Sequence, residues 1–89
     1  MKYGYCFLCG KWSLLERHHI FGGAYRKKSE KYGLVVDLCG IECHREGPNA
    51  AHRNKETMDK LHQYGQKKYM CEHNANIDEF RQEFGKNYL

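Results

Sequence analysis

The sequence predicts a single small α+β domain. Its 89 residues are too few for two domains that each fold unaided, and one domain of this length has only a thin core. Apolar, β-branched runs typical of strands occupy the first half, and helix caps with apolar residues at i, i+4 spacing occupy the last third. We therefore expect one domain over 1–89, with a core at about 5–55 and a helical part at about 54–89.

Five elements are expected in the first half. They are a tight turn over 5–11, a strand over 14–21, a polar loop over 26–31, a strand over 34–38 and a short helix that starts near Cys43. Gly22 and Gly23 end the first strand, and Pro48 must end the short helix quickly.

Two helices are expected in the last third. Asn54 is suited to cap a helix that runs to about Cys71. The apolar residues of this helix that fall near one face are Met58, Leu61, Tyr64 or Gly65, and Tyr69. Asn76 and Glu79 have the spacing of a capping box, Phe80 and Phe84 lie at i, i+4, and Gly85 suits the position after the helix.

Composition excludes several classes of protein. No apolar run is long enough for a transmembrane helix. The first six residues lack the apolar stretch of a signal peptide. These features predict a cytoplasmic protein that does not bind membranes. The formal net charge of +4 is too small to indicate nucleic-acid binding by itself.

The cysteines predict a structural zinc site. Thiols stay reduced in the cytosol, and five cysteines cannot all pair, so a disulfide framework is not expected. Cys6 and Cys9, and Cys39 and Cys43, form two closely spaced pairs that flank the predicted strands. Four thiolates in a closed tetrahedral cage are typical of structural Zn²⁺. The fifth, Cys71, is expected to be a core thiol.

The histidines fall into two groups. His18 and His19 are adjacent at the end of the predicted first strand, so their side chains must point to opposite faces and cannot share one role. His44 follows Cys43 directly, and His52 lies eight positions later. One of the adjacent histidines can hold a metal while the other addresses a water molecule. His62 and His73 have no such pattern and are expected at the surface.

These motifs together resemble those of HNH endonucleases, which belong to the His-Me finger, or ββα-metal, nucleases. The resemblance spans residues 5–55 and rests on Cys6-x-x-Cys9, the segment 16–20 with its adjacent histidines, the run 34–39, and Cys43-His44-Arg45. It implies a small ββα-metal core with a structural zinc knuckle and additional C-terminal helices. The short chain and its last residues are similar to small phage or prophage proteins of this kind.

The resemblance implies a role for each motif residue. His18 would ligate the catalytic metal, His19 would be the general base, and His44 would complete the metal site with His52 as a further ligand. The four paired cysteines would form the zinc knuckle. The catalytic ion would be Mg²⁺, Mn²⁺, Ni²⁺ or Zn²⁺; imidazole ligands favour the last three, and phosphate and water oxygens would suit Mg²⁺.

One departure from the family pattern stands out. The asparagine that usually begins the second strand is missing, and Gly33 and Leu34 occupy its place. In the family this asparagine orients the loop that carries the base. Asp37 or a backbone carbonyl is the expected substitute.

The implied partner is DNA, double- or single-stranded, in the bacterial host cell of a phage or prophage. A recombinase filament or another phage DNA-processing protein is a further implied partner. The residues expected to contact nucleic acid are basic: Arg26, Lys27, Lys28, Lys31 and Arg45. Such residues can follow the phosphate backbone without reading bases, although a solvated turn would have the same composition.

Two other functions fit the same residues. The first is a zinc-binding nucleic-acid or protein adaptor that keeps the fold without cutting. The second treats the histidines as additional structural zinc ligands, which would leave one of the adjacent pair unused.

Overall fold

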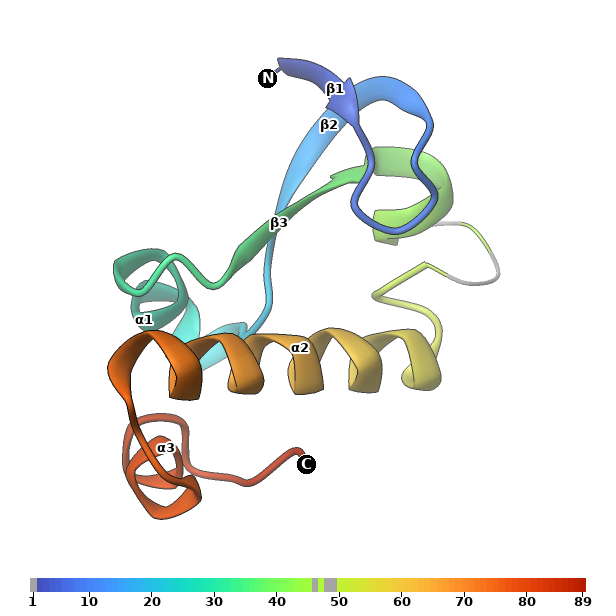
Figure 1. The fold of residues 1–89 in the computed structure, drawn as a ribbon. Coiled ribbons are helices and arrows are strands. Elements are labelled where there is room, and N and C mark those ends of the chain that lie inside the picture. The colour runs from blue at the N-terminus through green and yellow to red at the C-terminus, as the bar shows by residue number, and fades with distance from the viewer. Residues whose placement is uncertain (1, 46, 48–49) are drawn as a thin grey trace.

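The structure is a computed structural model and describes residues 2–45, 47 and 50–89. Its elements, in chain order, are β1 (Lys2–Tyr5), β2 (Trp12–His19), the 3₁₀ turn η1 (Gly23–Tyr25), α1 (Arg26–Lys31), β3 (Val35–Cys39), the π-helical turn η2 (Gly40–Arg45), α2 (Lys55–His73) and α3 (Ile77–Phe84). The α+β prediction is confirmed: the three strands form one sheet, α1 lies between β2 and β3 in the chain, and α2 and α3 follow the sheet (Figure 1).

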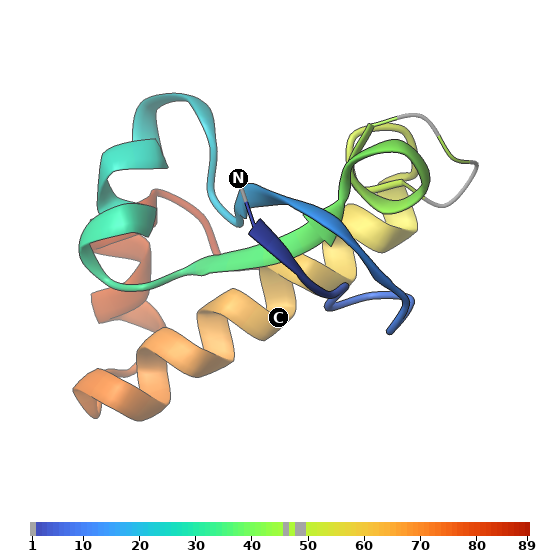
Figure 2. The same ribbon diagram turned by 90° about the horizontal axis from the view of Figure 1, so that it is seen from above.

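The sheet is antiparallel, with the strand order β1-β2-β3. In its register, His18 lies opposite Val36 and His19 opposite Val35. Helix α2 runs beneath the sheet, and α3 lies below α2 (Figure 1). Seen from above, α1 and η2 lie at opposite ends of β3 (Figure 2). The sheet therefore lies between helix α1 and the helical turn η2, which together carry most of the candidate site residues.

The core forms where the chain leaves β2 and meets the helices. Ile20 and Phe21 are buried, and the Phe21 ring lies 4.7 Å from that of Phe84 and 5.5 Å from that of Phe80, between ring centroids. Helix α2 approaches this segment closely at Gly65, where a Cβ atom would lie 2.6 Å from Ile20 Cγ2. Aromatic packing thus fixes the backbone that directly follows His19.

The two C-terminal helices, α2 and α3, begin as predicted. The Asn54 side chain accepts a hydrogen bond from Thr57 N at 3.0 Å, which caps α2. Asn76 and Glu79 form a reciprocal capping box at the start of α3. Gly85 ends α3 in the left-handed conformation, with φ of 78°. Local capping chemistry therefore places these helices correctly.

Several expectations need correction. The segment 26–31 is the helix α1 and not a loop, and the strand β1 was not expected. The strands of the hairpin are β2 and β3, shifted by one or two residues from the ranges predicted, and the short helical segment begins at Gly40.

Among the described residues, no helix is long and apolar enough to cross a membrane.

Two single residues also differ from expectation. Cys71 is exposed and is not a core thiol, because it lies on the outer side of α2. His62 is half-buried, and its ring stacks on Phe21 with centroids 5.4 Å apart and an angle of 9° between planes. The helical period of α2 turns His62 toward the aromatic core.

Candidate metal centres

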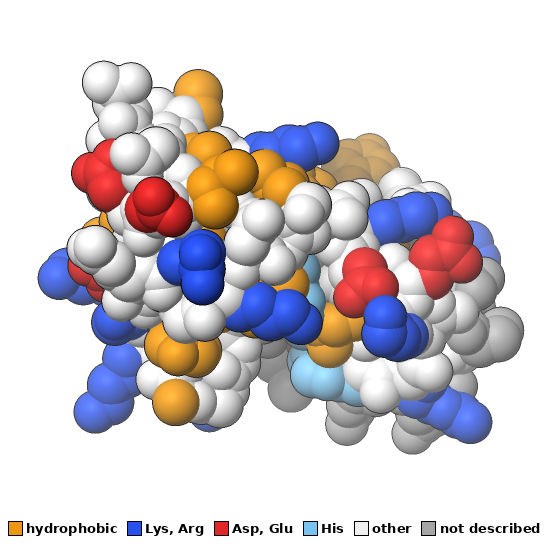
Figure 3. Space-filling model, turned by 90° about the horizontal axis from the view of Figure 1, so that it is seen from below, with side chains coloured by type: hydrophobic (Ala, Val, Ile, Leu, Met, Phe, Trp, Pro, Cys, Tyr) orange, Lys and Arg blue, Asp and Glu red, His pale blue; other side chains and the backbone are white. Residues whose placement is uncertain are grey.

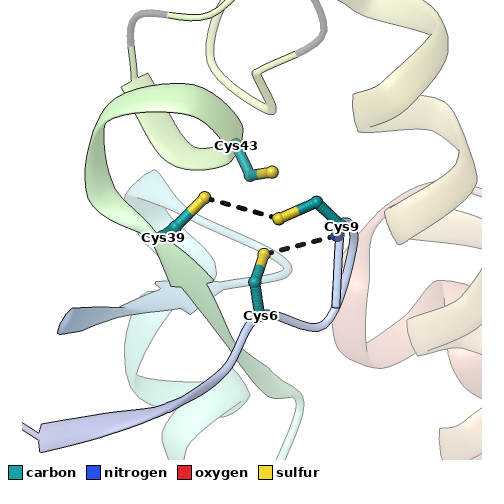
Figure 4. A group of neighbouring side chains, drawn as sticks. All are labelled: Cys6, Cys9, Cys39 and Cys43. Atoms are coloured by element: carbon teal, nitrogen blue, oxygen red, sulfur yellow. Dashed lines mark hydrogen bonds between the residues drawn. The ribbon is translucent and has the colours of Figure 1, made fainter. Parts of the chain in front are cut away.

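Four cysteines from three parts of the chain meet at one point. Cys6 and Cys9 lie in the turn between β1 and β2, Cys39 ends β3, and Cys43 lies in η2. Figure 4 shows all four side chains pointing toward one another. Their turn is held by backbone hydrogen bonds from Cys6 N to Lys11 O and from Gly10 N to Cys6 O. The positive φ of Gly10, 75°, closes this turn.

The sulfur geometry suits zinc. The four Sγ atoms lie within 4.8 Å of one another, and Cys9 Sγ lies 3.8 Å from Cys39 Sγ. With Zn–S bonds of about 2.3 Å, the edge of a regular tetrahedron of sulfur atoms is about 3.8 Å. A structural Zn²⁺ therefore fits this donor set with little rearrangement.

The thiols differ in how readily they ionise. Burial tends to raise the pKa of Cys6, but backbone N–H groups, that of Cys9 first, outweigh it and lower this pKa to about 6. Burial raises the pKa of Cys39 and, more strongly, that of Cys43. A bound divalent cation would supply the charge that four adjacent thiolates need.

Three histidines form a second cluster. His18 is the next-to-last residue of β2, His44 follows Cys43 in η2, and His52 lies in the turn before α2. One ring nitrogen of each lies within 4.8 Å of those of the other two. The ring centroids are 4.7–5.2 Å apart. The sequence grouped these three residues as ligands of one metal, and the structure brings them together.

His18 is the buried member of this cluster. Only 2% of its surface is exposed, and within the described structure neither ring nitrogen has a hydrogen-bond partner. Burial, followed by the proximity of His44, lowers the pKa of His18 to about 4. A buried, neutral imidazole without a partner costs free energy. A metal ion would satisfy the nitrogen that faces the cluster.

Glu16 orients His44. His44 Nδ1 lies 2.8 Å from Glu16 Oε1, a contact in which the imidazole donates. Its other nitrogen, Nε2, then carries a lone pair and faces His52 Nε2 at 3.1 Å. Metal-binding histidines usually donate their second N–H to a carboxylate in this way. Glu16 is thus placed to hold His44 in the tautomer that a metal requires.

His19 shares a pocket with the histidine cluster. The pocket has a volume of about 280 Å³ and is lined by Arg17, His18, His19, Gly22, Arg26, His44 and His52. His18 and His19 diverge as the strand geometry predicts: His18 meets His44 and His52, whereas His19 Nε2 lies 2.8 Å from Glu30 Oε1. The pocket therefore combines three histidines that could hold a metal, a separate histidine and two arginines.

Only part of the predicted basic surface faces this pocket. Arg26 lines it, whereas Lys28 Nζ bonds Glu83 O at 2.7 Å and pairs with Glu83 Oε2 at 3.1 Å. Lys31 Nζ lies 5.2 Å from the centre of the Tyr32 ring, and Lys27 is exposed. The side chain of Arg45 lies outside the described residues. Helix formation over 26–31 spreads these charges around an axis.

The face of the molecule below α2 carries no continuous basic surface among the residues described. Figure 3 shows Lys and Arg side chains spread over the face below α2, with acidic side chains between them. Arg17 and Arg26, which line the histidine pocket, are the basic side chains that lie beside the clustered histidines.

Sequence reasoning missed three residues around the site. Glu16 had a detectable signal, because it lies two positions before His18 and so shares its strand face. Glu30 and Ser29 had none, because both belong to a segment that was predicted to be a loop. Ser29 is fully buried, and its hydroxyl bonds both Phe21 N and Phe21 O, at 3.1 and 2.8 Å.

Comparison of the chain with protein-family models, with curated proteins and with solved structures found no match.

Proposed function

We propose that the protein is a metal-dependent DNA endonuclease that hydrolyses phosphodiester bonds. The observation that carries this proposal is the histidine pocket, in which His18, His44 and His52 converge while His19 stands apart from them. Three clustered imidazoles are suited to hold a divalent cation. A fourth imidazole with a different orientation is suited to move a proton.

The arrangement of strands supports the likeness to HNH nucleases. β2 and β3 pair antiparallel, with η1 and α1 in the connection between them, and β3 is followed directly by η2; these two strands and the helical turn carry His18, His19 and His44. The four cysteines stand at the end of the same unit. The ββα-metal classification is proposed on this ground.

A divalent cation held by the histidine cluster would polarise the phosphate and stabilise the negative charge that develops on its oxygens. His19 would accept a proton from water, and the water oxygen would form a new bond to phosphorus. The bond from phosphorus to the departing deoxyribose oxygen would break, and that oxygen would take up a proton from solvent. Histidine is suited to this task near neutral pH.

The arginines would hold the substrate. Arg26 lines the pocket as an exposed side chain, and Arg17 lines it while its guanidinium contacts Glu30. Guanidinium groups bind phosphate oxygens through paired N–H donors. Arg26 would thus anchor the phosphate beside the metal, without any readout of base sequence.

The test is a cleavage panel. Plasmid DNA and single-stranded DNA are incubated with the purified protein and Mg²⁺, Mn²⁺, Ni²⁺ or Zn²⁺, with EDTA as the metal-free control. His19→Ala, purified in parallel, serves to expose contaminating nucleases, and His73→Ala changes an exposed histidine at the far end of α2. Cleavage by the wild type and by His73→Ala, but not by His19→Ala, is expected.

Two results would overturn the proposal. Equal cleavage by the wild type and His19→Ala would mean that the activity belongs to a contaminant. No cleavage with any metal or either substrate, in folded protein that contains zinc, would favour the non-cleaving adaptor.

A further inference from the structure

The imidazole of His19 is engaged by a carboxylate that the sequence did not indicate. His19 Nε2 lies 2.8 Å from Glu30 Oε1, and the His19 side chain is only 13% exposed. We infer that Glu30 is a positioning residue, which fixes the proton of His19 on Nε2 and leaves Nδ1 as the basic nitrogen. This inference rests on the proposed function, because it assigns a task to the base of that reaction.

The contact determines the tautomer. A carboxylate accepts hydrogen bonds, so Nε2 of a neutral His19 must carry the hydrogen in this contact. Nδ1 then keeps its lone pair and is the nitrogen that can accept a proton from water. A histidine base held by a carboxylate is also stabilised once it becomes an imidazolium.

Glu30 is itself held in place. Arg17 Nη1 lies 3.0 and 3.2 Å from the two carboxylate oxygens of Glu30. The hydrogen bond from His19, and then that from Arg17, lowers the pKa of Glu30, so the carboxylate is the form present at neutral pH. Arg17 and His19 lie on the same face of β2, two residues apart, and Glu30 bridges them from α1.

The backbone that follows His19 is held by Ser29, the residue of α1 that precedes Glu30. The buried Ser29 hydroxyl bonds Phe21 N and Phe21 O, and Ile20 N donates to Leu34 O at 3.0 Å. These contacts hold the segment that directly follows His19. Helix α1 thus contributes two adjacent restraints, one on the backbone through Ser29 and one on the ring through Glu30.

Under the proposed function, this arrangement would serve in place of the missing asparagine. Asp37, one of the expected substitutes, pairs instead with Lys2 at 2.8 Å. The other expected substitute, a backbone carbonyl, is present as Leu34 O, which accepts from Ile20 N and restrains the backbone that follows His19. Only Glu30 among these groups contacts the His19 ring in the described structure.

The test observes the His19 ring directly. The full chain is labelled with ¹⁵N-histidine, loaded with diamagnetic Zn²⁺ and studied by NMR at about pH 8, where imidazoles are largely neutral. His19→Gln assigns the His19 signals. We expect an Nε2–H proton that exchanges slowly with water and is shifted downfield by the carboxylate.

Variants of Glu30 separate positioning from folding. Glu30→Ala should lose the protected Nε2–H signal, whereas Glu30→Gln, which keeps an acceptor oxygen, should retain it with a smaller downfield shift. Glu83→Gln removes a carboxylate of α3 that pairs with Lys28 of α1, the helix that carries Glu30. This variant should leave the His19 signal unchanged. Detection of His19 as the Nδ1–H tautomer, or an unchanged Nε2–H signal in Glu30→Ala, would overturn the inference.

Kinetics distinguish this inference from the proposed function. In an active enzyme, Glu30→Ala should lower kcat by about 10-fold or more with little change in KM, and Glu30→Gln should recover part of the loss. If the wild type cuts no DNA, the endonuclease proposal fails while the NMR result still decides the Glu30 contact. If the wild type cuts and Glu30→Ala has the wild-type kcat, positioning is wrong and the endonuclease stands.

Discussion

Cys43 and His44 are consecutive residues of η2 that belong to two different clusters. Cys43 joins the other three cysteines, and His44 joins His18 and His52. The backbone oxygens of Cys43 and His44 accept hydrogen bonds from Ala51 N at 2.7 Å and His52 N at 3.2 Å. The turn that brings a sulfur to the first cluster thus also sets two imidazoles of the second.

The first prediction is that the cysteine cluster binds one zinc ion. Metal analysis of protein purified without added zinc should give about one Zn²⁺ per chain, and Cys43→Ser should reduce this content and lower Tm. Cys71→Ser is the matched control, because Cys71 is exposed and lies outside the cluster. A wild-type protein that is folded without zinc would contradict the prediction.

The second prediction separates metal ligands from the base. His18→Ala or His44→Ala should lose cleavage because the catalytic metal binds more weakly, so excess metal should restore part of it. His19→Ala should lose cleavage by about 10²–10⁴-fold and gain nothing from excess metal. Zinc content and DNA binding should remain intact in His19→Ala. Cleavage by His19→Ala at the wild-type rate would remove the assignment of the base.

Sequence reasoning succeeded where the signal is local. The caps at Asn54 and Asn76 depend on residues three positions apart, and both helices start where the caps predict. The divergence of the His18 and His19 side chains, toward His44 and His52 and toward Glu30, follows from strand alternation alone. The cysteine pairs could be grouped because each pair is close in sequence, and folding of the hairpin brings the two pairs together.

It failed where tertiary contacts decide the outcome. The segment 26–31 is polar throughout, yet it forms α1, in which the single buried residue is Ser29. Lys28 also ties α1 to α3 by bonding Glu83. A charge pattern on an isolated segment indicates solvent exposure but does not specify such partners, so the contact between Glu30 and His19 could not be predicted.

The third prediction concerns Glu16. Glu16→Gln should weaken binding of the second metal by about 10–100-fold, because the amide no longer fixes the tautomer of His44 as a carboxylate does. Calorimetric titration of the zinc-loaded protein with Mn²⁺ or Ni²⁺ measures this affinity. Glu79→Gln, a change in the capping box of α3, is the control that should bind metal normally. Equal affinity in wild type and Glu16→Gln would show that Glu16 does not orient His44 for metal.

The fourth prediction contrasts two basic residues of α1. Arg26→Ala should weaken DNA binding on all sequences alike and flatten its salt dependence, because Arg26 lines the histidine pocket. Lys28→Ala should lower Tm and leave DNA affinity nearly unchanged, because Lys28 is committed to Glu83. Fluorescence anisotropy across a salt series measures both. Similar losses of affinity in the two variants would mean that α1 binds DNA through its charge as a whole.

The fifth prediction concerns Gly65, where α2 passes closest to the segment after β2. A Cβ atom at this position would lie 2.6 Å from Ile20 Cγ2 and 3.0 Å from Phe21 Cε2, and both side chains are buried. Gly65→Ala should therefore destabilise the fold by about 1–3 kcal/mol, even though alanine favours helix. Denaturant unfolding measures this loss. A second substitution, Ile20→Val, removes Cδ1, which lies 3.3 Å from this Cβ position, and keeps Cγ2, so it should relieve only part of the effect of Gly65→Ala. Because Ile20 follows His19 directly, Gly65→Ala should also reduce cleavage while the zinc content stays the same. If Gly65→Ala is as stable as the wild type in both backgrounds, the close approach of α2 to this segment is wrong.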